Sequence, residues 1–133
     1  LNEDAARLAR ASLELRANDP DALALLDQSL RGAGDPTALA AVLEERIEAS
    51  EDDEQRVDLL RRLARLYEDR LKDEEKAERS WTRLLEIDSS DGEALKKLSA
   101  IYEKAGNAPK LIDMLERRIA VSESGGMSGA DAG

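Results

Sequence analysis

The chain repeats itself after 72 residues, and this repetition constrains its fold more than any other feature of the sequence. When residues 1–51 are placed over residues 73–123 without gaps, 18 of the 51 positions are identical. Shared composition alone would give about one identity in ten positions, so the match indicates a true duplication. Apolar residues keep their register, as Leu43 and Leu115 do. We therefore interpret the chain as an array of equivalent units.

Each half of the duplication divides again, and the spacing inside the smaller units is helical. Large apolar residues recur 37 and then 35 residues later, as Leu23, Leu26 and Leu30, then Leu60, Leu63 and Tyr67, then Leu95, Leu98 and Tyr102. Steps of three and four residues collect side chains on one face of a helix. No stretch shows the alternating polarity of a half-buried strand. An all-α fold is expected.

Helix starts and stops are marked by capping residues. Asp19-Pro20 and Asp35-Pro36 place a carboxylate acceptor before a residue whose φ suits the first helical turn, while glycine supplies permissive backbone where helices end. These signals predict seven helices, at about residues 2–17, 20–32, 36–50, 53–71, 74–88, 92–105 and 108–122. Short connections make neighbouring helices antiparallel, so we expect a row of helical hairpins, an α-solenoid.

Composition removes most catalytic chemistry. The chain has no Cys and no His, so it offers no thiol nucleophile, no imidazole base and no zinc site built on those ligands. Its 30 acidic and 20 basic side chains give a net charge of -10, which argues against a nucleic-acid partner. The longest apolar run, residues 38–43, is too short to span a bilayer. Thirty carboxylates on a solenoid surface form no pair that stands out, so no enzyme activity, cofactor or metal is expected.

The hairpins resemble tetratricopeptide repeats. The residues that carry the resemblance are Leu60, Leu63, Ala64 and Tyr67 on one helix, followed by Asp73, Ala77, Trp81 and Leu84. A second copy, Leu95, Leu98, Ser99, Tyr102 and Gly106, matches on its first helix, but Leu111 and Arg118 replace small residues on the next. The pair around Leu23 is weaker, because Asp27 stands at the small position.

The resemblance implies a right-handed superhelix whose first helices line a concave groove that binds a protein or peptide segment. Residues 1–122 would form this repeat domain as a piece of a longer array, and residues 123–133 a disordered tail. Arg outnumbers Lys by 14 to 6, a composition typical of bacteria with GC-rich genomes. The sequence leaves the localisation open.

Four positions outside the buried stripe of the first helices are candidates for the groove: Gln28, Arg61, Arg65 and Lys96. Arginine suits an acidic partner because its planar fork can hold a carboxylate in a bidentate manner. A simpler interpretation is that Asp58 and other nearby acids form solvated ion pairs with these bases, each contributing about 0.3–0.5 kcal/mol.

A second class of function is a structural spacer or self-associating array. Apolar residues that a neighbouring repeat would cover occur near both ends: Leu8 and Leu13, then Ile112, Leu115 and Ile119. An uncovered apolar end favours end-to-end association. Trp81 aligns with the apolar stripe and is expected in the core. The acidic run at residues 51–54 is interpreted as a helix start, because negative charge is favourable at that end of a helix.

Overall fold

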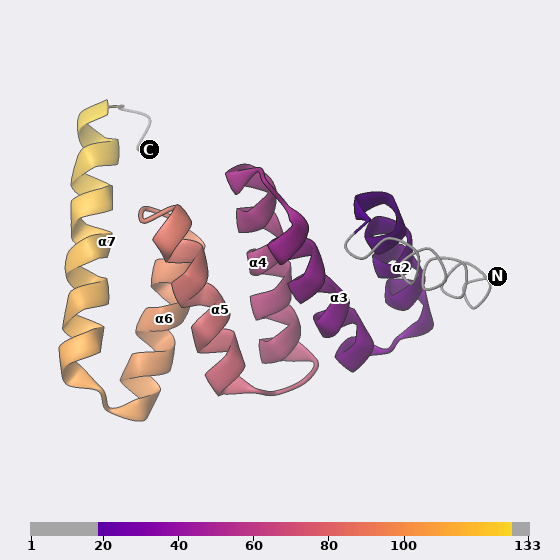
Figure 1. Cartoon of the computed structure of the whole chain (residues 1–133). Helices are drawn as coiled ribbons and strands as arrows, with labels where there is room; N and C mark the ends of the chain where they lie inside the picture. Colours follow the sequence, from indigo (N-terminus) through magenta and orange to yellow (C-terminus); the bar gives the residue numbers. More distant parts are fainter. Residues whose placement is uncertain (1–18, 129–133) are drawn as a thin grey trace. The chain divides into compact units, whose positions relative to one another are not determined.

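A computed structural model describes residues 19–128, and its side chains are described through residue 124. These residues form six α-helices and no strand. The helices are labelled in Figure 1. The helices are α2 (Pro20–Ala33), α3 (Pro36–Ala49), α4 (Asp53–Asp69), α5 (Glu74–Ile87), α6 (Gly92–Ala105) and α7 (Ala108–Ser128). The predicted all-α helical-repeat fold is confirmed. The helix expected at residues 2–17 lies outside the described residues.

Aspartate side chains cap several helix starts, including the two expected at Asp19 and Asp35. Side-chain oxygens of Asp19, Asp35 and Asp91 accept hydrogen bonds from backbone N–H groups of the first turns, at 3.2, 3.1 and 2.9 Å. Each bond satisfies a donor that the helix itself leaves unpaired. At the other ends, Gly34 and Gly106 adopt left-handed φ values of 70° and 71°. That conformation lets the backbone turn sharply into the next helix without a Cβ clash.

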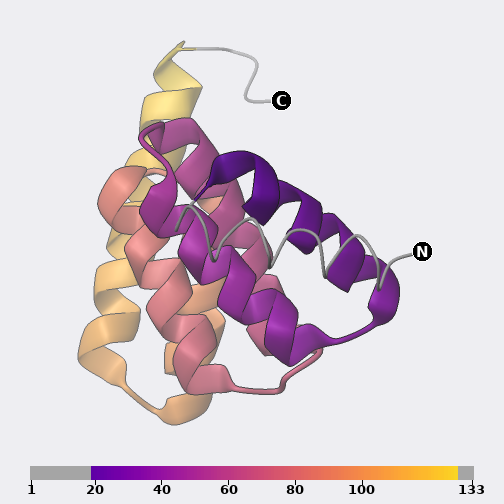
Figure 2. The ribbon, with the colours of Figure 1, turned by 45° about the vertical axis from the view of Figure 1, so that its right-hand side comes forward.

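The chain divides into two compact units, Leu1–Ala77 and Glu78–Gly133, where the sequence suggested one. In the first unit α3 packs against both α2 and α4, and in the second α6 packs against α7 (Figure 2). Connections of a few residues make these packed neighbours antiparallel hairpins. The division falls within α5.

Each unit has its own set of buried side chains at the repeating positions. The first unit buries Leu23, Leu26, Leu30, Leu39, Leu43, Ile47, Leu60, Leu63, Ala64, Tyr67 and Ala77. The second buries Trp81, Leu84, Leu85, Ala94, Leu95, Leu98, Ile101, Tyr102 and Met114. Full burial of a large apolar side chain contributes about 1.5–3 kcal/mol, so these stripes supply the main driving force for hairpin packing.

The last helix is longer than the sequence suggested. We expected it to end at residue 122 and a tail to follow, but α7 continues through Ser128. No proline follows Ser122, and the Gly125-Gly126 pair lies within α7 without ending it, although glycine has a low helix propensity. The boundary at residue 122 is therefore corrected. Among the described residues, no helix has both the length and the apolar character needed to cross a membrane.

The turn between α4 and α5 contains a non-glycine residue in the left-handed region. Lys72 has a φ of 53°, and it is exposed. The chain closes around it with hydrogen bonds from the Leu71 N–H to the Leu66 carbonyl at 3.0 Å and from the Asp73 N–H to the Tyr67 carbonyl at 2.8 Å. The turn therefore requires a conformation that an L side chain disfavours by about 1–2 kcal/mol.

Replacing Lys72 with glycine should stabilise the protein. We expect Lys72→Gly to raise the free energy of unfolding by about 0.5–1 kcal/mol, because relief of the left-handed strain outweighs the added flexibility of the unfolded chain. Lys72→Ala is the matched control, since it removes the charge and keeps the strain. Urea denaturation followed by circular dichroism measures both, and a Lys72→Gly variant no more stable than Lys72→Ala would contradict the prediction.

Candidate functional site

The first unit contains a fully buried carboxylate held by three arginines. Asp27 on α2 has 0% of its side chain exposed. Arg62 on α4 donates two hydrogen bonds to it, from Nη1 to Oδ2 at 2.9 Å and from Nη2 to Oδ1 at 2.8 Å. Arg46 on α3 donates from Nη1 to Oδ2 at 2.5 Å, and Arg31 Nε lies 3.4 Å from Oδ1. One carboxylate thus connects three helices.

The charge state of Asp27 follows from its surroundings. Burial disfavours the ionised form, but the hydrogen bonds and positive charges of Arg62 and Arg46 outweigh that effect, so the pKa lies below its ordinary value of 3.8. The carboxylate is ionised at neutral pH. A buried charge is tolerated only when it is paired and hydrogen-bonded, and the bidentate fork of Arg62 provides both.

Repeat register explains how the helices place these residues. Asp27 occupies the position that Ala64 and Ser99 hold in the later hairpins, where a small residue faces the packed interior. A carboxylate at this position is directed between α2 and its neighbours. Arg46 and Arg62 reach it from α3 and α4, and 20% and 32% of their side chains stay exposed, so most of each side chain is covered.

We call Asp27, Arg31, Arg46 and Arg62 the Asp27 cluster. Its one negative and three positive groups leave a surplus of two positive charges in a chain of net charge -10. A local excess of arginine can attract carboxylates of a partner. The cluster contains no nucleophile and no group placed as an acid or base.

Three of the four predicted groove residues belong to this first unit. Gln28 on α2 and Arg65 on α4 are exposed. Arg61 is partly exposed and its Nη1 lies 3.3 Å from an Asp58 carboxylate oxygen, so the expected intrahelical ion pair is present at this position. Gln28 and Arg65 hold equivalent positions on helices that the Arg62–Asp27 hydrogen bonds connect. From the repeat register we therefore expect the Gln28 and Arg65 side chains to point to the same side of the first unit.

Lys96, the fourth predicted residue, is exposed on α6 in the second unit. It holds the position that corresponds to Arg61. The structure thus places the predicted residues on two units, three on the first and one on the second. A single site made of all four remains a prediction.

The second unit has a polar cluster around Tyr102. The Tyr102 hydroxyl donates a hydrogen bond to Glu78 Oε2 at 2.9 Å, and Lys110 Nζ lies 4.0 Å from that oxygen and 5.5 Å from the tyrosine ring centroid. In the first unit Lys76 lies 5.7 Å from the Tyr67 ring in the same manner. Both lysines are third residues of their helices, so a cation over a tyrosine recurs with the repeat.

Other sequence expectations can be placed directly. Trp81 is fully buried as predicted, and its indole N–H has no hydrogen-bond partner among the described residues. α4 begins at Asp53, within the acidic run at residues 51–54, as the interpretation of this run as a helix start requires. Within residues 19–128 no group of three or more acidic side chains is arranged to share a metal ion. Leu8 and Leu13 lie outside the described residues.

Sequence reasoning missed the role of Asp27. The aspartate was counted only as a departure from the small residue usual at that position. The available signal was physical: an acidic residue on a buried stripe needs a cationic partner, and Arg46 and Arg62 lie on the next two helices. The Glu78–Tyr102 hydrogen bond left no comparable signal, since both residues are compatible with an ordinary surface or core position.

Removing the Asp27 charge should destabilise the first unit. We expect Asp27→Asn to lower the free energy of unfolding by about 2–3 kcal/mol, because the arginines lose their common acceptor but can partly rehydrate. The stabilisation is present above pH 3.8 and is lost as the pH falls through the lowered pKa of Asp27. The difference between wild type and Asp27→Asn should therefore narrow in acid, as urea titrations at several pH values can measure.

Asp58→Asn is the control for this prediction. It removes an ion pair whose carboxylate is 69% exposed and should change the stability by less than about 0.5 kcal/mol. Equal effects of Asp27→Asn and Asp58→Asn would show that the buried cluster contributes no more than a surface pair.

The tyrosine cluster predicts an unusual alkaline titration. Burial and then the hydrogen bond to Glu78 raise the pKa of Tyr102 to about 12, so the neutral phenol stabilises the fold below pH 10 and that contribution is lost as the pH rises toward 12. In a Tyr67→Phe background Tyr102 is the only tyrosine, and absorbance reports its ionisation. Glu78→Gln should lower the pKa of Tyr102, whereas Glu86→Gln, on the same helix, should not. An unchanged titration in Glu78→Gln would contradict the assignment.

Comparison with solved structures finds structural likeness. No protein-family description and no curated protein sequence matches the chain. Among solved structures, the chain is similar to the crystal structure of MamA, with 14% sequence identity and a TM-score of 0.44 over 92% of this chain and 90% of that one. The fold class rests on the helices and their packing described above.

Proposed function

We propose that the chain is a tetratricopeptide-like scaffold that binds an extended acidic segment of a partner protein on the face formed by α2 and α4. The observation that carries the proposal is the Asp27 cluster, which joins three helices and leaves a surplus of positive charge in an acidic chain. Gln28 and Arg65 are exposed beside it.

Because the Asp27 cluster joins α2, α3 and α4, their exposed face is suited to binding a flexible segment of a partner. Because the helices are already packed, the scaffold loses little conformational freedom on binding, and the cost of ordering falls mainly on the partner. Arg65 supplies a planar fork for a carboxylate, and the Gln28 side chain can donate and accept hydrogen bonds. Arg61 lies one turn before Arg65 on α4, and its Nη1 lies 3.3 Å from an Asp58 carboxylate oxygen.

The role proposed is binding, and none of these residues is assigned a catalytic step. Lys96 on α6 would extend the same preference for acidic partners to the second unit, where it is exposed. A spacer role would require no such preference. Sensitivity of binding to the charge of the ligand therefore separates the two functions.

The test uses a labelled peptide of alternating Glu and Leu, with a Lys and Leu peptide as the reversed-charge probe. We expect the acidic peptide to bind the full chain, more weakly as salt is added, and the basic peptide not to bind by the same surface. Arg65→Glu and Arg61→Glu should each weaken binding of the acidic peptide about tenfold. Fluorescence anisotropy measures both.

Arg79→Glu is the matched control, because it makes the same charge change at an exposed position on α5 in the second unit. It should leave the affinity nearly unchanged. Equal losses in Arg65→Glu and Arg79→Glu would mean that only net charge matters, and no loss in the Arg61→Glu, Arg65→Glu double variant would remove the proposed surface.

A further inference from the structure

The outer face of α7 differs sharply from its counterpart on α3, although the two helices are related by the duplication. The 72-residue offset pairs Ala40 with Ile112, Leu43 with Leu115 and Ile47 with Ile119. The three α3 residues are 4%, 1% and 4% exposed, whereas the three α7 residues are 54%, 39% and 58% exposed. Equivalent apolar positions are therefore covered on one helix and open to solvent on the other.

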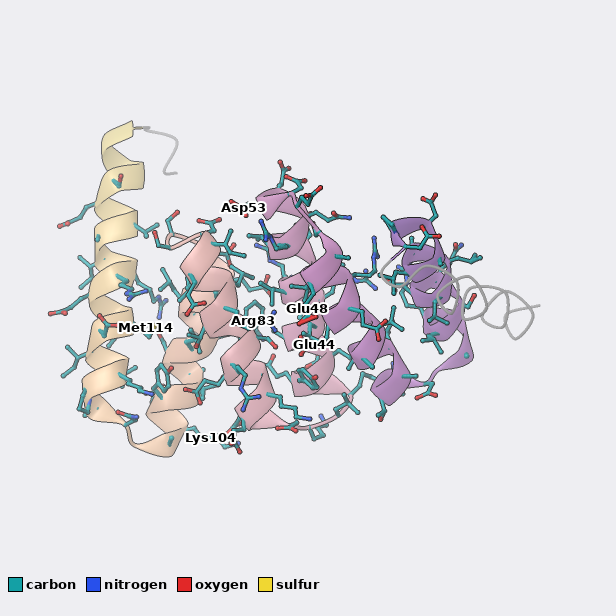
Figure 3. The ribbon with its side chains drawn as sticks, viewed as in Figure 1. Glu44, Glu48, Asp53, Arg83, Lys104 and Met114 are labelled. Carbon is teal, nitrogen blue, oxygen red and sulfur yellow. The ribbon has the colours of Figure 1, made fainter. Side chains whose placement is uncertain are left out.

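The inner faces of the two helices are equivalent. Val42 on α3 and Met114 on α7 are a duplicated pair, and both are buried, at 5% and 7% exposure. Met114 is labelled on α7 in Figure 3, and α7 packs against α6 as α3 packs against α2. The difference arises on the outer side, where α4 packs against α3. The first unit thus shows what kind of element fits such a face: an amphipathic helix.

We propose that the outer face of α7 binds an amphipathic helix of another polypeptide, with an aliphatic row like that of α4 and an acidic residue at the position of Arg62. The aliphatic row follows from α4, whose Leu59, Leu63 and Leu66 are buried at helical spacing. Three neighbouring aliphatic side chains exposed on one helix face form the kind of surface that a partner helix covers.

The acidic residue follows from a charge difference between the two units. In the first unit Arg46 and Arg62 meet at buried Asp27. In the second unit the duplicated positions are Arg118 and Ser99, and the Ser99 hydroxyl donates its hydrogen bond to the Leu95 carbonyl at 2.7 Å. Arg118 is exposed and has no carboxylate at the position of Asp27. A partner helix with an arginine there would meet like charge, whereas an acidic residue would pair with Arg118.

A second copy of α7 is a poorer occupant. In a two-fold pair of antiparallel helices, each edge of the helix meets the same edge of its copy. The exposed face is flanked by Glu116 and Glu123 on one edge and Arg118 on the other. Self-pairing would therefore place like charges opposite one another along both edges, which is unfavourable. A foreign helix can avoid this arrangement.

The experiment uses two labelled peptides with the sequence of residues 53–69, one unaltered and one carrying Arg62→Glu, titrated with the full chain. We expect the Arg62→Glu peptide to bind about tenfold more tightly than the unaltered peptide. Leu115→Glu in the chain should weaken its binding by at least about tenfold. Ala120→Glu is the matched control, since Ala120 is exposed on the polar side of α7 with Asp113 and Arg117, and binding should be unchanged.

Arg118→Glu in the chain supplies the decisive comparison. It should reverse the preference, so that the unaltered peptide binds more tightly than the Arg62→Glu peptide. Displacement of α4 inside the first unit predicts the opposite pattern, because there Arg62 pairs with Asp27 and the unaltered peptide would be favoured in every variant. That pattern, or binding insensitive to Leu115→Glu, would overturn the proposal.

Sedimentation of the chain alone tests whether a second copy of the chain covers the exposed face of α7. A monomer across the concentration range supports docking of a foreign helix. A dimer that Leu115→Glu abolishes and Ala120→Glu preserves would assign the face to self-association and overturn the proposal.

Discussion

Each helix within residues 19–128 has an apolar face that a neighbouring helix can cover, and this constraint organises the described structure. The positions that repeat along the sequence are the ones that meet a neighbour, so burial follows the repeat. Leu23, Leu60 and Leu95 are almost completely buried at equivalent places. Polar residues at the remaining positions keep the chain strongly acidic without interfering with packing. The same constraint leaves α7 with an apolar face open to solvent.

The Asp27 cluster adds a polar contact to this apolar scheme. An ion pair in a packed interior gains little over an apolar contact of similar volume, because desolvating the charges offsets their attraction. Its contribution lies in geometry, since the fork of Arg62 fits one orientation of one carboxylate. The cluster therefore adds an orientation-dependent contact among α2, α3 and α4 to the apolar contacts of the surrounding leucines.

Much of the fold could be predicted from the sequence, because its determinants are local. Caps such as Asp35 and Gly106 mark helix ends within a few residues, and periodicity identifies the buried face. The end of α7 was missed because nothing in the sequence stops that helix at Ser122. The candidate site was harder to predict from the sequence. Arg65 could be recognised as exposed from its helical position, but the partners of Asp27 depend on contacts between helices far apart in sequence.

The substitution of Ser99 for Asp27 in the second unit means that the hairpins are not interchangeable modules. The hairpin of α2 and α3 carries Asp27 together with Arg31 and Arg46, but the bidentate partner Arg62 lies on α4. Placing this hairpin next to one without that arginine would remove both Arg62 hydrogen bonds from a buried carboxylate. Recombination that changes the order of the hairpins would thus lower the stability of the fold, whereas contacts made only by leucines would be less affected. The charged side chains of neighbouring hairpins therefore favour one order of the hairpins, although the hairpins have similar backbones.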